Sequence, residues 1–352
     1  MQLTADADPR DLSLGRDPAC DVCIASKQVS RRHAVITQGT TGRGRITDLE
    51  SSNGTRVNGR RVATAELQRG DVIRLGSWVG VVTESPSPFE ELGPGLFGGA
   101  TLQAVLAPLK QGAQSSMPVV IEGESGTGKQ TVARSLHAWS GRKGGFAAFD
   151  CGATPTARVE VELFGQPTDG FHDASLGGLL SGTASGTLML NQVSALSLGV
   201  QARLLDVMTR GGVHPIGAAA PSDARIVITT QESLASGVRD GRVHQELLAH
   251  VHIAGASVRL PPLRQRREDV AGIFLQLLRG LSERGRNLEI SPDLIEKLCL
   301  HTWPFNVREL VGLTRRILTL HGDEPLLSEQ HLPDRFTAVA TDPFPSEERN
   351  KA

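Results

Sequence analysis

The chain has 352 residues, which is enough for two domains or more at roughly 100–200 residues per domain. Hydrophobic residues make up 39% and charged residues 21%, a balance that suits a soluble globular protein. The formal net charge of −1 excludes a bulk electrostatic attraction to nucleic acid or to a membrane surface. The sequence shows neither a signal-peptide pattern nor an apolar run of about 18 residues, so we expect a cytoplasmic protein.

In chain order, residues 1–84 contain short strand-like runs between turns, which predicts a β-sandwich. Asn53-Gly54 and Asn58-Gly59 are typical of tight turns, because both residue types tolerate positive φ. Residues 85–97 are rich in Pro, Gly and Ser, the composition of a linker.

The chain then changes its pattern. In residues 98–262 apolar strand-like runs alternate with helical stretches, which predicts a parallel sheet with crossover helices. Residues 263–336 read as mostly helical, and residues 337–352 read as a disordered tail. The expected fold is therefore multidomain, with a β-sandwich followed by an α/β domain and a helical subdomain.

The four cysteines do not predict a disulfide framework in a chain of this kind. Cys20 and Cys23 form a C-x-x-C, which can be a redox pair or half of a zinc site. Tetrahedral zinc needs four ligands, and the sequence offers neither a second C-x-x-C nor a nearby histidine pair. We therefore interpret both cysteines as small apolar residues near a strand and predict no metal site.

The N-terminal domain carries an ordered set of short motifs. They are Gly15-Arg16, Ser30-Arg31-Arg32-His33, Ser51-Ser52-Asn53-Gly54-Thr55, Val57-Asn58-Gly59 and the run from Leu67 to Gly76. Together they resemble the forkhead-associated (FHA) domain, a β-sandwich that binds phosphothreonine peptides through loops at one end. The resemblance covers nearly the whole first domain.

This resemblance implies a phosphothreonine site. A phosphate carries close to two negative charges and three acceptor oxygens, which an arginine fork and hydroxyl or amide donors satisfy. Arg16 and Ser30 would bind the phosphate with Arg31 close by, Ser52 would support the site and Asn53 would hold the peptide backbone. The partner would be a phosphothreonine protein in a Ser/Thr kinase pathway, and the neighbouring histidine would brace the loop.

A second site follows an apolar strand in the α/β domain. The run Gly123-Glu124-Ser125-Gly126-Thr127-Gly128-Lys129 satisfies G-x-x-x-x-G-K and precedes a helix. Such a loop wraps phosphates with backbone N–H groups, and its lysine reaches the terminal phosphates. Gln130 follows, where many loops of this type place a Ser or Thr for magnesium. We expect ATP, with or without Mg²⁺, as the ligand.

Residues 98–336 resemble the AAA+ module of sigma-54 activators, hexameric ATPases that remodel sigma-54 RNA polymerase. The resemblance is carried by the phosphate loop and by six further motifs in the family's order: Phe149-Asp150-Cys151-Gly152, Glu162-Leu163-Phe164-Gly165, Gln201-Ala202-Arg203-Leu204-Leu205, Leu260-Pro261-Pro262-Leu263-Arg264, Arg267-Glu268-Asp269 and Trp303-Pro304-Phe305-Asn306-Val307-Arg308-Glu309-Leu310. It implies that Arg308, on the helical lid, senses bound nucleotide.

The family's catalytic groups are replaced in this chain. Its second acidic motif reads GTLFLDE, and here Asn191 and Gln192 stand at the two acidic positions. An amide cannot accept a proton near neutral pH, so Gln192 cannot act as a general base. Gln231 stands where the family has a strand-end asparagine, and His244 and His250 stand at the two arginines that reach a neighbouring subunit.

Three further features bear on the function. An alternative alignment places His252 at the second arginine position, and it is also not an arginine. The family's GAFTGA loop, which contacts sigma-54, corresponds to residues 169–174, where His172 replaces the threonine. We expect no helix-turn-helix after residue 336 and so no direct DNA-binding domain. His244 and His250 are six positions apart, which does not put them on one face of a helix, so we interpret these two and His252 as surface or packing residues.

We therefore predict a signalling protein with an FHA domain and an AAA+ module that binds ATP but has lost hydrolysis. It could form homo- or hetero-oligomeric rings, or contact sigma-54 RNA polymerase or its activators. One alternative is an active sigma-54 activator with atypical catalytic residues. Another is a phosphopeptide adaptor whose second domain has no nucleotide function.

Overall fold

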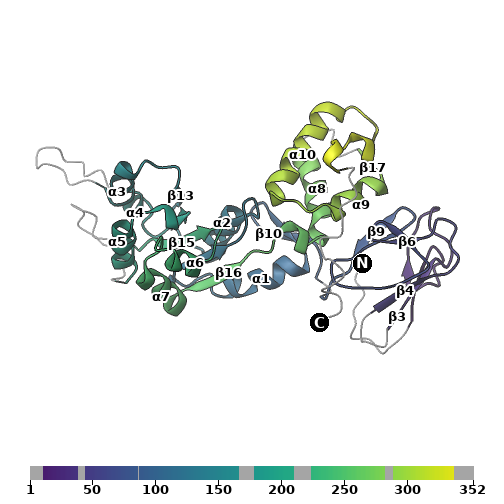
Figure 1. Cartoon of the computed structure of the whole chain (residues 1–352), viewed down its shortest axis with the longest axis horizontal. Helices are drawn as coiled ribbons and strands as arrows, with labels where there is room; N and C mark the ends of the chain where they lie inside the picture. The colour runs from purple at the N-terminus through teal and green to yellow at the C-terminus, as the bar shows by residue number, and fades with distance from the viewer. Residues whose placement is uncertain are drawn as a thin grey trace, which may run out of the picture. The chain divides into compact units, whose positions relative to one another are not determined.

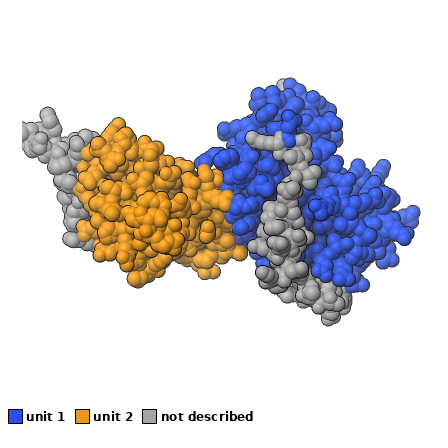
Figure 2. All heavy atoms as spheres, in the orientation of Figure 1, with its two compact units in different colours: residues 1–90, 97–101, 262–352 blue, residues 91–96, 102–261 orange. Residues whose placement is uncertain are grey.

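The structure is a computed structural model that describes residues 11–38, 44–85, 87–165, 178–209, 223–281 and 288–336. The chain forms two compact units (Figure 2). Unit 1 contains residues 1–90, 97–101 and 262–352, and unit 2 contains residues 91–96 and 102–261. The predicted tail, residues 337–352, lies outside the described residues.

The N-terminal part of unit 1 is a β-sandwich. Its strands are β1 (Leu12–Gly15), β2 (Val22–Cys23), β3 (Ala34–Gln38), β4 (Gly44–Asp48), β5 (Thr55–Val57), β6 (Arg60–Val62), β7 (Thr64–Glu66), β8 (Val72–Leu75) and β9 (Trp78–Val81). One sheet has the order β2-β1-β3-β4-β7 and the other the order β6-β5-β8-β9. Both sheets contribute to one apolar core, in which Leu14 and Ile46 of the first sheet pack with Ile73 and Leu75 of the second.

The C-terminal part of unit 1 is helical, as predicted (Figure 1). Its elements are η2 (Leu263–Gln265), α8 (Glu268–Leu281), β17 (Glu289–Ile290), α9 (Pro292–Leu300), α10 (Asn306–His321), β18 (Leu326–Leu327), η4 (Glu329–His331) and η5 (Asp334–Phe336). Helix α9 begins at an N-cap, where the Ser291 side chain accepts a hydrogen bond from the Leu294 N–H, with Pro292 in the first turn. Trp303 is fully buried in the core that these helices share.

Strand β8 connects the sandwich to the helical part of unit 1. Its residues alternate in direction, as in any strand, so Ile73 lies in the sandwich core while Val72 belongs to the helical core. Arg74 lies on the same side as Val72 and binds both Asp293 and Glu296 of α9, with an Nη1–Oε2 distance of 2.9 Å to Glu296. These contacts attach the sandwich directly to α9.

Unit 2 is an α/β domain, as predicted. Its elements are α2 (Lys129–Ser140), α3 (Thr156–Phe164), α4 (Leu179–Gly182), η1 (Val193–Ala195), α5 (Leu198–Thr209), α6 (Leu234–Arg239), α7 (Gln245–Ala254) and the strands β12 (Val119–Glu122), β13 (Phe146–Asp150), β14 (Thr187–Asn191), β15 (Arg225–Thr230) and β16 (Ala256–Arg259). The strands are parallel and have the order β13-β14-β15-β12-β16.

Alternate residues of these strands bury opposite faces of the sheet. Leu188 and Leu190 pack into one apolar cluster with α3, α5 and α7, whereas Met189 packs into the other with α1 (Ala100–Gln111) and α2. Because both faces are covered, β15 is buried along its whole length. All carboxyl ends of these parallel strands lie at one edge, and residues that follow them can share a site.

Elements at the boundary between the units are β10 (Glu90–Gly93), β11 (Leu96–Gly98) and α1 (Ala100–Gln111). The segment predicted as a linker thus contains strand structure that its Pro and Gly content did not indicate. Within the described residues, no helix is both long and apolar enough to cross a membrane. Cys20, Cys23, Cys151 and Cys299 are all unpaired.

Candidate phosphothreonine and nucleotide sites

The loop after β1 and the loop before β3 run side by side in the sandwich. The Arg16 N–H donates to the Ser30 carbonyl at 2.9 Å, and the Asp17 N–H donates to the Arg31 carbonyl at 3.0 Å. Gly15 permits this approach, because a Cβ at that position would lie 2.0 Å from the Arg31 carbonyl oxygen. A shallow cavity of about 230 Å³ lies here, lined by Arg16, Asp17, Pro18 and Arg31.

The other predicted phosphothreonine residues adjoin Ser30. Ser30 Oγ accepts a hydrogen bond from the Ser52 N–H at 3.1 Å, which leaves its own hydrogen available to a phosphate oxygen. Asn53 Nδ2 donates to the Gln28 carbonyl at 2.7 Å, and its Oδ1 is the atom suited to accept a peptide N–H. The structure thus brings Arg16, Ser30, Arg31, Ser52 and Asn53 to one end of the sandwich.

His33 braces these loops from inside the sandwich. Its side chain is fully buried, its Nδ1 lies 3.2 Å from the Ser30 nitrogen and its Nε2 lies 3.2 Å from the Gly54 carbonyl oxygen. Since the amide donates to Nδ1 and the carbonyl accepts from Nε2, the ring is the neutral tautomer with hydrogen on Nε2. Burial lowers the pKa of His33 and outweighs the opposing effects of the Gly54 carbonyl and Asp48, so the ring stays neutral.

Asp48 is a supporting residue that the sequence motifs did not indicate. Its carboxylate accepts hydrogen bonds from the Ser51 N–H and from the hydroxyl groups of Ser51 and Thr55, the latter two at 2.6 Å. Burial opposes ionisation, but these hydrogen bonds prevail and lower the pKa of Asp48. Its position at the end of β4, just before the Ser-Ser-Asn-Gly run, is the signal that could have revealed it.

The phosphate loop of unit 2 has the predicted strand, loop and helix context. It connects β12 to α2, and Gly126 and Gly128 adopt φ of 80° and 103°, values that favour glycine. Lys129 Nζ donates to the Gly123 and Glu124 carbonyls at 2.6 and 2.9 Å. The α2 N-terminus thus follows the loop directly, and the Lys129 ammonium group lies against the loop's own carbonyls.

Three further residues in and after the phosphate loop, Ser125, Thr127 and Gln130, differ in their burial. Thr127 is buried and its hydroxyl donates to the Glu124 carbonyl at 2.9 Å, which holds the loop closed. Ser125 lies between these residues in the loop, and Gln130, in the first turn of α2, is exposed. An exposed amide at this position offers magnesium an oxygen but no charge.

The replaced acidic motif lies at the same sheet edge. Asn191 ends β14, and its amide is engaged at both ends: Nδ2 donates to Asp150 Oδ2 at 2.9 Å, and Oδ1 accepts from Thr229 Oγ1 at 2.9 Å. Gln192 follows in the left-handed region with φ of 59°. Gln231, just after β15, is exposed.

The two histidines predicted at arginine positions belong to α7. His244 is its N-cap residue and its N–H donates to Gln201 Oε1 at 2.8 Å, while His250 lies within the helix. Neither belongs to a potential metal cluster within the described residues, and His252 does not either. The segment 169–174, which resembles the sigma-54 contact loop, lies outside the described residues.

Arg308 lies in α10 of unit 1, whereas the phosphate loop belongs to unit 2. Together with Phe305, Glu309, Gly312 and Leu313 it lines a shallow cavity of about 270 Å³. Phe305 is 60% exposed, so an aromatic face lies open beside the guanidinium. This pairing suits a ligand that carries both a planar ring and negative charge.

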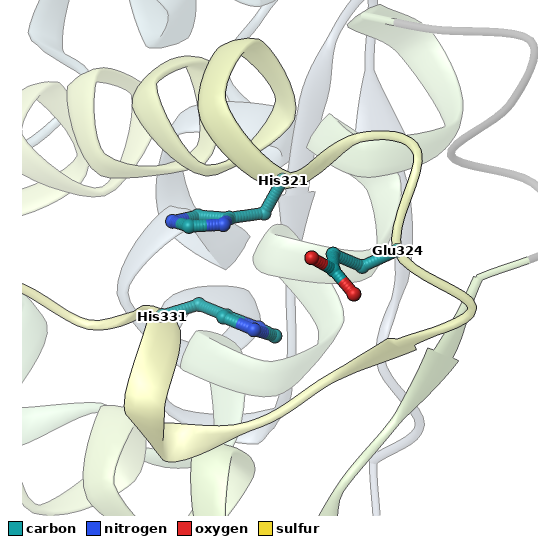
Figure 3. Close-up of side chains that lie close together, drawn as sticks. All are labelled: His321, Glu324 and His331. Carbon is teal, nitrogen blue, oxygen red and sulfur yellow. The ribbon is translucent and has the colours of Figure 1, made fainter.

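A group that sequence reasoning missed is His321, Glu324 and His331, at the end of α10 and in η4 (Figure 3). Their nearest potential ligand atoms lie within 4.8 Å of one another, and the two rings stack with centroids 4.5 Å apart. However, His331 Nδ1 accepts the Ser328 N–H at 3.1 Å in a capping box. A neutral ring with that acceptor carries its hydrogen on Nε2, so His331 would have to give up the cap to ligate a metal.

Family models match the chain in three places. They are the FHA domain over residues 12–76, the sigma-54 interaction domain over residues 97–255 and the AAA+ ATPase lid domain over residues 264–349. The chain therefore joins an FHA domain to the sigma-54 interaction domain and an AAA+ lid, the architecture that the motifs predict. The helical part of unit 1 described above is this lid.

Similar proteins are known regulators. The acetoin catabolism regulatory protein of Cupriavidus necator is 37% identical over 249 residues, covering 69% of this chain and 37% of that protein. The DNA-binding transcriptional regulator NtrC of Rhizobium meliloti is 32% identical over 236 residues, 65% of this chain and 48% of that protein. A crystal structure of NtrX from Brucella abortus in complex with ATP has a TM-score of 0.59 at 27% identity, covering 72% of this chain and 59% of that one. This chain thus spans only part of the length of these relatives.

Proposed function

We propose that this protein is a bacterial transcription-regulatory protein that binds phosphothreonine partners through its FHA domain. We further propose that its AAA+ module binds ATP without efficient hydrolysis. The module would then act as a nucleotide-stabilised scaffold that assembles with copies of itself or with active sigma-54 activators. Relatives that are sigma-54-dependent or DNA-binding regulators support the transcriptional setting.

Phosphothreonine binding is supported by the loops at the end of the sandwich. Arg16 and Arg31 line one cavity, and the Ser30 hydroxyl lies in the adjoining loop. Two guanidinium groups and a hydroxyl donor match the charge and the acceptors of a phosphate dianion. Buried His33 and half-buried Asp48 hold the loops in place before a ligand arrives, which reduces the entropy lost on binding.

Nucleotide binding is supported by the loop between β12 and α2. Gly126 and Gly128 place no side chain over the loop backbone, and the helix N-terminus adds a positive dipole end. The similarity to a protein crystallised with ATP agrees with this role. Lys129 would turn from the loop carbonyls to the phosphates when a nucleotide enters.

Loss of hydrolysis is carried by one observation, the replacement of both acidic groups after β14 by Asn191 and Gln192. A general base contributes about 10²- to 10⁴-fold to a rate, and neither amide can accept a proton near neutral pH. If ATP hydrolysis in a neighbouring subunit needs an arginine from this chain, the histidines at positions 244 and 250 would lower its rate by a further factor of roughly 10³–10⁵. These losses are not additive, but each alone lowers turnover by orders of magnitude.

The test is ATP turnover by the purified full-length protein with Mg²⁺, beside the double variant Asn191→Asp, Gln192→Glu. We expect bound nucleotide and no measurable turnover from the wild type. Turnover of roughly 1–10³ per second would contradict the proposal and identify an active remodelling ATPase. A gain of turnover in the double variant would show that the remaining catalytic geometry is intact.

The variant Lys129→Ala distinguishes the proposed nucleotide binding from the adaptor alternative, in which unit 2 binds no nucleotide. Bound ATP raises the free energy of unfolding by RT ln(1 + [L]/Kd), about 2.7 kcal/mol at a concentration 100 times Kd. We expect this ATP-dependent rise in the wild type and its loss in Lys129→Ala. Lys143→Ala, which removes an equal charge elsewhere in unit 2, serves as the control. Equal unfolding of all three proteins with and without ATP would favour the adaptor.

A further inference from the structure

The sheet edge of unit 2 retains a carboxylate close to Asn191. Strand β13 ends at Asp150, and its parallel register with β14 places Asp150 opposite Asn191. The two side chains meet in a hydrogen bond of 2.9 Å between Asn191 Nδ2 and Asp150 Oδ2. The negative charge that is missing on β14 is therefore present on the neighbouring strand.

The hydrogen bonds around Asn191 fix the direction of its amide. Thr229 Oγ1 donates to Oδ1, so the carbonyl end points toward β15 and the amino end toward Asp150. Asp150 Oδ1 accepts the Gly152 and Ala153 N–H groups at 3.0 and 3.1 Å. Asp150 is nevertheless exposed, so water can reach its carboxylate.

The coordination chemistry of Mg²⁺ indicates a role for the pair of Asp150 and Asn191. Mg²⁺ keeps several of its waters and is bound in nucleotide sites through one or two carboxylates and the phosphates. A carboxylate does not need to touch the ion, because it can accept hydrogen bonds from the metal's waters and balance its charge. The neutral amide at 191 can orient such a water but cannot balance charge, whereas Asp150 can.

We propose that Asp150 supplies the acidic group for the Mg²⁺ of a bound nucleotide, acting through Asn191 and water. The inference rests on the proposed nucleotide binding. In this view the charge of the site has moved by one strand, which preserves metal-assisted binding while the proton acceptor at position 192 is lost. Asp150 is a positioning residue here, since it acts through another group.

A purely structural role for Asp150 would be to cap the turn that follows β13. Asparagine caps such N–H groups about as well as aspartate, so Asp150→Asn keeps the turn; it removes the charge and places an NH₂ group where Oδ2 accepts from Asn191. Adding Asn191→Asp to this variant returns the charge to β14. Asp240→Asn, which removes an exposed carboxylate of unit 2 that binds Arg242, is the matched control.

The experiment measures ADP affinity of the full-length proteins by calorimetry, with Mg²⁺ and with EDTA. ADP is used because turnover cannot change its concentration. We expect Mg²⁺ to tighten binding to the wild type and to Asp240→Asn. In Asp150→Asn this Mg²⁺ effect should fall roughly tenfold, equivalent to about 1.4 kcal/mol of coupling, and the double variant should recover it.

Each outcome bears on a different claim. An unchanged Mg²⁺ effect in Asp150→Asn, or no recovery in the double variant, would overturn the role of Asp150. ADP binding that is insensitive to Mg²⁺ in the wild type would overturn it too, while leaving nucleotide binding intact. Absence of ADP binding under both conditions would instead reject the proposed nucleotide function. If Asp150→Asn does not fold, Asp150→Ser replaces it, because a serine hydroxyl also accepts from turn N–H groups.

Discussion

The FHA loops and the sheet edge of unit 2 that adjoins the phosphate loop, here called the nucleotide edge, differ in their side-chain chemistry. At the FHA loops both the geometry and the chemistry expected for a phosphate ligand are present, with Arg16 and Arg31 lining one cavity. At the nucleotide edge the loop geometry is present, but Asn191 replaces an acidic group and its amide is bound on both sides. In the proposed function, the first site binds a phosphothreonine as built, and the second binds nucleotide without its catalytic groups.

The comparison separates backbone geometry from side-chain chemistry. The phosphate loop depends on its glycines, on the strand before it and on the helix after it, and these support the core of unit 2 as well as ligand binding. The replaced acidic motif lies at the half-buried end of β14, where an amide costs the fold little. Hydrolysis can therefore be lost while the fold and the phosphate loop remain.

The largest expected effect is on the FHA side, from Arg16→Ala. A hydrogen bond to a charged group contributes roughly 1.5–3 kcal/mol, so affinity for a phosphothreonine peptide should fall about 100-fold. The measurement is fluorescence anisotropy with a degenerate phosphothreonine peptide library, against its unphosphorylated counterpart. Arg60→Ala, an exposed arginine on β6, is the control for lost positive charge.

If Arg16→Ala and Arg60→Ala weaken binding equally, the cavity is not the phosphate site and only net charge attracts the peptide. If the wild type does not distinguish phosphorylated from unphosphorylated peptides, the FHA domain is not competent. Either result would remove the contrast between a complete site and an altered one.

A smaller effect is expected where the sandwich meets the lid. Arg74 is 13% exposed and binds Glu296, which is 6% exposed, so Arg74→Met leaves this buried carboxylate with only the longer contact to the more exposed Arg56. We expect a loss of roughly 2 kcal/mol in the stability of α9, less than for a fully buried pair. The pKa of Asp293, which hydrogen bonds from Arg74 lower, should rise toward its ordinary value.

Amide hydrogen exchange across α9 measures this loss, since a chain with several domains does not unfold in one step. Arg56→Met is the control, because Arg56 is 43% exposed and lies 3.7 Å from the same carboxylate. Its effect should stay below about 0.5 kcal/mol. Equal exchange in both variants would show that Arg74 does not hold the sandwich on the lid.

This contact also reaches the recognition loops. Arg74 Nε donates to the Gly76 carbonyl at 2.9 Å, and Gly76 lies against the Gln28 carbonyl that accepts from Asn53. A Cβ on Gly76 would lie 2.2 Å from that oxygen, so the approach depends on glycine. Arg74→Met should therefore also weaken peptide binding slightly, in contrast to the direct loss from Arg16→Ala.

Much of the architecture followed from local sequence signals. The Asn-Gly turns, the phosphate loop between an apolar strand and a helix, and the helical C-terminal part are written in consecutive residues, and each is present in the structure. The contact between Arg74 and α9 could not be predicted from the sequence. Arg74 is 219 positions away from Asp293 and 222 positions away from Glu296, and no local pattern marks these pairs.

The hydrogen bond between Asp150 and Asn191 was equally hidden. Both residues belonged to recognised motifs, but their meeting depends on the parallel register of β13 and β14. Asp48 likewise gains its role from Ser51 and Thr55, which fold back toward it after the strand has ended. Motifs thus indicated the candidate sites, whereas strand pairing determined which side chains lie together.

The smallest effect concerns pH and the brace under the FHA loops. The pKa of His33 is lowered from its ordinary value of 6.5, chiefly by burial, so the folded state binds fewer protons there than the unfolded state. The stability that neutral His33 provides is therefore fully present above about pH 6.5 and falls as the pH drops toward the folded pKa. The slope is at most about 1.4 kcal/mol per pH unit for one proton.

NMR titration of the labelled imidazoles tests this in the peptide-free protein, because the peptide's own phosphate also titrates near pH 6. The His33 signal is assigned by its absence from His33→Gln, and its midpoint should lie below the ordinary value of 6.5. Protonation would place a donor where the Ser30 N–H already donates, so the loops that carry Ser30 and Asn53 should loosen on acidification. A midpoint at or above 6.5 would mean that the ring is not held as a neutral acceptor, and the recognition loops would then lack the brace that His33 is proposed to give them.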